Sequence, residues 1–115
     1  MFNYHLVDHF NRQLKSHQKK YISLKNDVYF FLKNFTLTQA VPLGNNLYKA
    51  RLFCRSLNKG KSGGLRIIML LFHHRNLIIP VTLFFKGDYE DISEEELFYH
   101  SSQVYAELRA NNIIF

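Results

Sequence analysis

Two long apolar runs constrain the fold of this chain most. Residues 65–72 and 77–85 are almost continuously apolar, and only the four residues from His73 to Asn76 separate them. Runs of this length are typical of buried strands, and so short a connection joins antiparallel neighbours in a hairpin. Pro80 lies inside the second run and has no backbone N–H to donate. It therefore predicts a bulge, or an edge position on that side of the strand.

A third strand is expected just before these two. Residues 47–55 alternate between a more apolar set (Tyr48, Ala50, Leu52 and Cys54) and a more basic one (Leu47, Lys49, Arg51, Phe53 and Arg55). A period of two indicates a half-buried strand, here with a basic outer face. The preceding residues 36–46 contain Pro42, Gly44 and two asparagines, and this composition predicts a connector without regular structure.

Helical periodicity occurs on both sides of the strands. Apolar residues recur at spacings of three or four and predict one face of the second helix: Tyr21, Leu24, Val28, Leu32 and Phe35. Asp8 is a good N-cap for a first helix that reaches about Gln18. Ser93 followed by three glutamates forms a capping box for a last helix that ends near Asn111.

These elements predict one α+β domain spanning residues 1–115. Phe2 to Val7 alternates weakly and is expected to form a short first strand. The predicted order is β-α-α-β-β-β-α, with an antiparallel sheet of about four strands. Helices gathered on one face of such a sheet are the expected architecture.

Composition excludes several kinds of protein. A single cysteine rules out a disulfide framework and any cysteine-based zinc site. No apolar run approaches the 18 residues of a membrane-spanning helix, and Met1 to Lys20 lacks the apolar core of a signal peptide. We therefore expect a cytoplasmic protein with no membrane partner.

Charge is segregated along the chain. Residues 1–87 hold 14 of the 15 Lys and Arg residues against two acids, whereas residues 88–115 hold Arg109 against seven acids. Such a block of positive charge attracts a polyanion, although a charge run by itself is more often a solvated surface without a ligand. The arrangement of the cations, rather than their number, has to carry the functional argument.

Several familiar motifs do not fit. Gly60-Lys61-Ser62 resembles the end of a phosphate-binding P-loop, but Arg55 stands where that motif needs its first glycine, and a strand rather than a helix should follow. His5 and His9 have a helical spacing with no carboxylate nearby, which makes them a weak metal pair. We expect no metal and no small-molecule cofactor, and Cys54 is most simply a small buried side chain.

The strands are expected to collect cations on one open face. The middle of the first long strand, the start of the next and the end of the third lie side by side in an antiparallel sheet. This places Lys49, Arg51, Arg66 and Lys86 around one pocket. Arg55, Lys59, Lys61 and Tyr89 lie near them in sequence. Basic side chains with aromatic platforms suit single-stranded RNA, whose bases are free to stack.

At these residues the chain resembles the RelE/HigB-type toxins of bacterial toxin–antitoxin modules. The resemblance covers roughly residues 47 to 108. It is carried by four segments: Leu47-Tyr48-Lys49-Ala50-Arg51-Leu52, Gly60-Lys61-Ser62-Gly63-Gly64-Leu65-Arg66-Ile67-Ile68, Leu83-Phe84-Phe85-Lys86 and Glu90-Asp91-Ile92-Ser93.

The resemblance implies a small RNase-like fold that cleaves messenger RNA, usually in the ribosomal A site, and that a cognate antitoxin silences. Cleavage would proceed without a metal, by attack of the substrate's own 2′-OH on the adjacent phosphate. Lys49, Arg51, Arg66 and Lys86 match the catalytic cations of the family. The RNA-binding set would comprise Arg55, Lys59, Lys61 and Tyr89.

One departure from the family pattern keeps alternatives open. The usual tyrosine before the last strand's lysine is Phe84 here, and Tyr89 is displaced along the chain. Some members of the superfamily poison DNA gyrase and cleave nothing, as ParE-like toxins do. A member that only binds RNA or an antitoxin is the other alternative.

Overall fold

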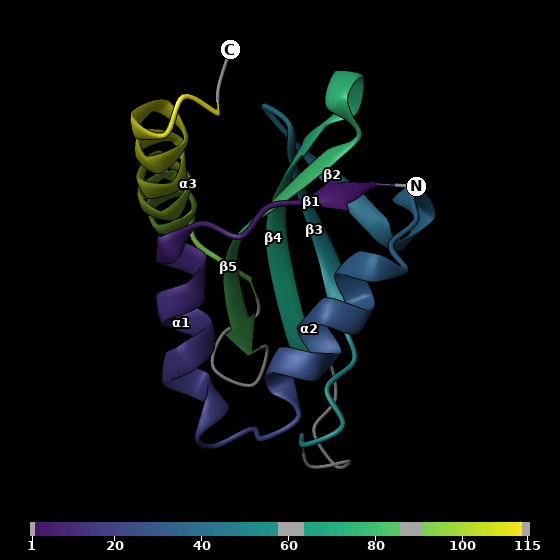
Figure 1. Ribbon diagram of the computed structural model, residues 1–115. Coiled ribbons are helices and arrows are strands. Elements are labelled where there is room, and N and C mark those ends of the chain that lie inside the picture. Colours follow the sequence, from purple (N-terminus) through teal and green to yellow (C-terminus); the bar gives the residue numbers. More distant parts are fainter. Residues whose placement is uncertain (1, 58–63, 86–90, 114–115) are drawn as a thin grey trace.

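The computed structural model describes residues 2–57, 64–85 and 91–113. A mixed five-stranded sheet has the order β1-β5-β4-β3-β2, and three helices pack around it (Figure 1). The strands are β1 (Asn3–Tyr4), β2 (Ala40–Gly44), β3 (Leu47–Leu52), β4 (Leu65–Phe72) and β5 (Leu77–Phe85). The helices are α1 (Asp8–Gln18), α2 (Leu24–Lys33) and α3 (Glu94–Ala110), and two short 3-10 turns are η1 (Leu37–Gln39) and η2 (His73–Arg75). The predicted α+β class is confirmed.

Strand β2 was not predicted, because Pro42 and Gly44 disfavour an ordinary strand. It pairs antiparallel with β3 and forms the outer edge of the sheet, where the missing N–H of a proline is tolerated. Asn45 and Asn46 both have positive φ, as in the tight turns that match the twist of a hairpin. The two asparagines that indicated a loop therefore form the turn of a hairpin between β2 and β3.

Strand β1 is shorter than predicted and has the opposite direction. Only Asn3 and Tyr4 pair, in parallel with the start of β5, so the sheet is not wholly antiparallel. The N-cap of α1 is Val7 rather than Asp8. The capping function falls to Glu107 of α3, whose carboxylate accepts hydrogen bonds from the backbone N–H groups of Asp8 and His9 at 2.8 and 2.7 Å.

The expected bulge at Pro80 is confirmed. Met69 is paired with Pro80 but Ile68 with Thr82, so Val81 is the extra residue of a bulge. On the other side of β5, β1 pairs only with Leu77 and Ile78, so Pro80 also lies beyond the end of that neighbour. The proline therefore needs no ladder hydrogen bond on this side.

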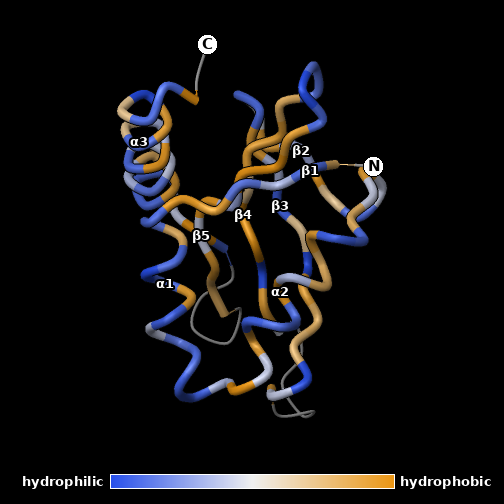
Figure 2. The backbone as a smooth tube through the Cα atoms, in the orientation of Figure 1, coloured by the Kyte–Doolittle hydropathy of each residue, from blue (hydrophilic) through white to orange (hydrophobic). Residues whose placement is uncertain are grey.

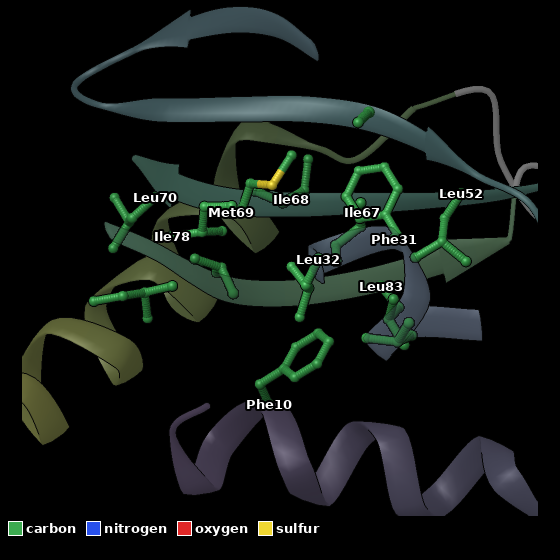
Figure 3. Packing of buried hydrophobic residues seen from close by; sticks show 14 of the residues in the cluster. Phe10, Phe31, Leu32, Leu52, Ile67, Ile68, Met69, Leu70, Ile78 and Leu83 are labelled. Atoms are coloured by element: carbon green, nitrogen blue, oxygen red, sulfur yellow. The ribbon is translucent and has the colours of Figure 1, made fainter. Parts of the chain in front are cut away.

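The core lies between the sheet and the helices. Phe10 of α1, Phe31 and Leu32 of α2, and Ile67 and Leu83 of the sheet are buried in one cluster (Figure 3). The hydropathy pattern agrees, since the central strands are mostly hydrophobic while α1 and α3 carry long hydrophilic stretches (Figure 2). The predicted apolar stripes of both N-terminal helices are thus the faces that pack.

Both faces of the central strand are buried, as its almost continuous apolar run predicted. Ile67 and Met69 lie on one face of β4 and Ile68 and Leu70 on the other, and all four are fully buried. Helix α3 packs against β5 and α1 rather than beside α2. Among the described residues, no helix combines the length and the apolar character that crossing a bilayer requires.

Candidate functional site

Three cations from two strands share one face of the sheet. Arg51 of β3 lies directly opposite Arg66 of β4 in the antiparallel register, and Lys49 is two residues before Arg51. Side chains two residues apart in a strand point to the same face, and the Cβ atoms of directly opposed residues are about 4.5–5.5 Å apart. The structure therefore brings these three predicted residues together. We call them the cation face.

The cation face is an electrostatic cost to the folded protein. Like charges placed directly opposite each other in a sheet are destabilising. Partial burial lowers the pKa of Arg66 below its usual value, the neighbouring Arg51 lowers it further, and Asp91 opposes both. A guanidinium nevertheless stays protonated at neutral pH. An arrangement that concentrates positive charge in this way is suited to binding an anion.

Asp91 supplies the counter-ion of the cation face. Its Oδ2 accepts a hydrogen bond from Lys49 Nζ at 2.9 Å, and the backbone N–H of Ile92 donates to its Oδ1 at 2.8 Å. The hydrogen bond from Lys49 is the main cause that lowers the pKa of Asp91. Slight burial acts against it, and the Ile92 N–H and the charges of Lys49 and Arg66 act with it. The Asp91 side chain is 54% exposed, so this carboxylate is open to displacement.

In the sequence, Asp91 belongs to the acidic segment and to the family motif, and its contact with Lys49 was not predicted. The two residues are 42 positions apart, and nothing in their local patterns indicates that they meet. The contact also shows that the segment leading into α3 lies against the face of the sheet that carries Lys49.

Arg55 belongs to a different network. Its Nε donates to Asp27 Oδ1 of α2 at 2.8 Å, and its backbone N–H donates to Asp27 Oδ2 at 2.9 Å. Ser23 also donates to this carboxylate, at 2.7 Å. Burial raises the pKa of Asp27, but these hydrogen bonds and the Arg55 charge outweigh it, so the pKa is lowered overall. The guanidinium of Arg55 thereby ties the end of β3 to α2, and its part in RNA binding stays a prediction.

The remaining predicted residues cannot be placed. Lys86 of the catalytic set, together with Lys59, Lys61 and Tyr89 of the RNA-binding set, lies outside the described residues. Their roles stay predictions that rest on the sequence.

The histidines lie apart from the cation face. His73 is in η2, at the opposite end of β4 from Arg66, and its Nε2 is 3.1 Å from the hydroxyl of Tyr48. His9 does not pair with His5 as considered from the sequence. Its Nε2 is 2.8 Å from His100 Nδ1 of α3, which joins α1 to α3. The described part of the chain holds no group of three or more His, Cys, Asp or Glu residues suited to a metal ion.

A groove adjoins the cation face. It has a volume of about 430 Å³ and is mostly apolar, and Arg51 contributes to its lining. Phe53, the residue just after β3, lines the groove beside Arg51. The other lining residues come from α2, the residue that follows it and η1: Asp27, Phe30, Phe31, Asn34 and Gln39. In the sequence, Phe53 belongs to the basic alternate set of the third strand, and no pattern marks Phe30 or Phe31 as residues of a binding site.

Comparison with known proteins adds a structural likeness and no match in sequence. No family model and no curated protein matches the chain. Among solved structures, the chain is similar to a mutant of the E. coli toxin RelE in the free state, with a TM-score of 0.44 and 15% sequence identity. The match covers 77% of this chain and 87% of that one.

Proposed function

We propose that this protein is the toxin of a toxin–antitoxin module and cleaves messenger RNA without a metal. The observation that carries the proposal is the register that places Arg51 opposite Arg66 with Lys49 on the same face. The residues of this face are those at which the sequence resembles the RelE/HigB-type toxins. The resemblance, rather than the comparison with solved structures, supports the choice of substrate.

The cation face suits the chemistry of 2′-OH attack. The 2′-oxygen forms a bond to phosphorus while the bond to the 5′-oxygen breaks, which leaves a 2′,3′-cyclic phosphate and a free 5′-OH. Negative charge gathers on the non-bridging phosphate oxygens in the transition state. Fixed cations at that point lower the barrier, and arginine forks match phosphate oxygens in pairs. Arg51 and Arg66 would take this part.

Lys49 would exchange partners when RNA binds. In the structure its ammonium group contacts Asp91, and an incoming phosphate offers the same type of oxygen acceptor. Lys86 completes the catalytic set of the proposal on the strength of the sequence. The 2′-OH gives up its proton as it attacks, and the 5′-oxygen takes up a proton as it leaves.

The proposal extends to location and partners. The protein would act in the cytoplasm on message held in the ribosomal A site, and a cognate antitoxin would silence it. Because the cation face is positively charged, an antitoxin segment that covers it should be acidic.

Primer extension on a translated message tests the activity. Wild-type protein should create new 5′ ends, and Arg66→Ala should reduce them by at least about 100-fold, the scale of losing one transition-state contact. Arg75→Ala is the matched control, since Arg75 is an exposed arginine in η2 at the far end of β4, and it should cleave like wild type.

Three other outcomes would contradict the proposal. Intact message with wild-type protein would remove the nuclease. Inhibition of DNA supercoiling without RNA cleavage would indicate a gyrase poison. Equal cleavage of untranslated and translated message would remove the ribosome from the proposal.

A further inference from the structure

We propose that the groove between α2 and the free edge of β3 binds a nucleobase of the RNA strand whose phosphate the cation face holds. This inference rests on the proposed function, and adds to it a subsite that reads the base beside the contacted phosphate.

Exposed aromatic side chains are the first observation. Phe30 of α2 is 70% exposed and Phe53, just after β3, is 78% exposed, and both line the groove. Phenylalanine is among the residues most often buried, so two exposed rings at one groove indicate a binding surface. Flat apolar rings are the platforms on which unpaired bases stack.

The groove is open because β2 does not extend along the last residues of β3. The first residue of β2, Ala40, pairs with Ala50, so in the described chain no strand lies beside β3 from Arg51 onward at this edge. Helix α2 and Gln39 form the other wall. The opening therefore lies where the sheet edge and the helix diverge.

Arg51 connects the groove with the cation face. It lies opposite Arg66 in the register, and it also lines the groove. Phe53 follows two residues later, about 6.6 Å further along an extended chain. This separation is comparable to the length of one extended nucleotide. A phosphate held at Arg51 would thus place a neighbouring base at Phe53.

The chemistry of the groove favours a base over a protein segment. Its volume falls in the range of small-ligand pockets, and the amides of Asn34 and Gln39 line it. Asn34 Nδ2 donates to the carbonyl of Phe30, and Gln39 Oε1 accepts from the N–H of Thr36. Each amide has a second polar atom with which it can contact a base edge. The one carboxylate in its lining, Asp27, is already neutralised by Arg55. A helical peptide would instead require a row of apolar anchors along a longer groove.

Binding of cleavage-resistant RNA provides the test. The probe is a fluorescent single-stranded oligonucleotide with 2′-O-methyl sugars, compared with a series in which one base at a time is removed. Wild-type protein should lose about 5- to 30-fold in affinity at one position of the series, the scale of one base–aromatic stack. Phe53→Ala should bind the intact RNA that much more weakly and should no longer distinguish the abasic position.

Matched variants separate the subsite from general effects. Phe98→Ala removes a ring that is 74% exposed on α3, and should bind every oligonucleotide like wild type. Phe53→Tyr keeps the ring and should retain the position dependence. Thermal unfolding of each variant checks that the fold is intact.

Several results would overturn the inference. These are unchanged RNA affinity in both Phe53→Ala and Phe30→Ala, equal weakening for intact and abasic RNA, or no RNA binding by wild type. If these two variants lose binding to an acidic protein partner while their RNA affinity is unchanged, the groove belongs to that partner instead. If wild-type protein cleaves message and Phe53→Ala changes neither cleavage nor RNA binding, the inference fails and the proposed function stands. If RNA is bound base-selectively but not cleaved, the inference stands and the proposed function fails.

Discussion

Asp27 and Asp91 each form an ion pair with a cation of β3 or of the segment after it, and the two carboxylates differ in how far they are buried. Asp27 has 9% of its side chain exposed and accepts hydrogen bonds from Arg55 and Ser23, whereas Asp91 has 54% exposed and contacts Lys49. The Asp27 carboxylate is enclosed by protein, although the Arg55 side chain is 61% exposed, and its contacts fix α2 to the segment after β3. The Asp91 contact lies at the protein surface, near the charge of Arg66. Burial therefore distinguishes a structural ion pair from one that a ligand can replace.

The largest effect expected is on stability, from Asp27→Asn. The substitution removes the charge that Arg55 faces and weakens three hydrogen bonds to one carboxylate. The free energy of unfolding should fall by about 2 kcal/mol, which is the scale of charge-assisted hydrogen bonds. Urea unfolding measures it. Asp91→Asn is the matched control and should change stability far less, because exposed pairs contribute little. Equal losses in the two variants would break the comparison.

For RNA affinity, Asp91→Asn is expected to have the larger effect of the two substitutions. Asp91→Asn removes the carboxylate that competes with phosphate for Lys49, so single-stranded RNA should bind up to about 5-fold more tightly, as for an exposed ion pair. The gain should shrink at high salt because the charges are screened. Fluorescence anisotropy at two salt concentrations measures both effects. Weaker binding by Asp91→Asn would show that the carboxylate orients Lys49 rather than competing for it.

Acid pH sharpens the same contrast. Both pKa values are lowered, so each carboxylate contributes stability that is fully present above the usual Asp value of 3.8 and is lost as pH falls through the folded-state pKa. Asp27 accepts three hydrogen bonds that favour its charged form, whereas solvent screens the exposed Asp91 pair. Asp27→Asn should therefore flatten the acid limb of the stability curve more than Asp91→Asn. Urea unfolding between pH 2 and 5 measures the two limbs. Identical curves for the two variants would contradict this.

A smaller effect is expected nearer neutral pH, from the contact between α1 and α3. Burial lowers the pKa of His9, His100 and Arg12 add to this, and Glu107 opposes it; burial also lowers the pKa of His100, against the charge of Glu96. The folded protein therefore holds both rings neutral at pH 7. The unfolded chain takes up protons below about 6.5, so stability is full above that pH and falls as the pH drops towards the folded-state values.

His100→Gln isolates this histidine contribution. The variant should lose less stability than wild type between pH 7.5 and 5.5, and the Asp27→Asn protein should keep the wild-type slope over that range. Urea unfolding at these two pH values provides the comparison. A wild-type slope in His100→Gln would show that other groups carry the pH dependence.

Local patterns were sufficient for much of the fold. The stripe from Leu24 to Phe35 and the apolar runs of β4 and β5 predicted their elements, because burial of one face enforces a period. The shared face of Lys49, Arg51 and Arg66 followed from strand parity and a hairpin connection. These features depend on neighbours in sequence or on a single turn.

Features built from distant residues were not predictable in the same way. Strand β2 forms because β3 offers it an edge, against the preferences of Pro42 and Gly44. The contact between Asp91 and Lys49 and the groove at Phe30 and Phe53 depend on how α2 and the approach to α3 pack on the sheet. No local period records such packing, so the counter-ion and the aromatic groove required the structure.

The carboxylate of Glu107 holds the first amides of α1 although 99 residues separate it from Asp8. The first amides of α1 are therefore protected only while α3 is packed against α1. A partner that lifted α3 would free the amide protons of Asp8 and His9 at the same moment, and their hydrogen exchange would accelerate together while the remainder of α1 stayed protected.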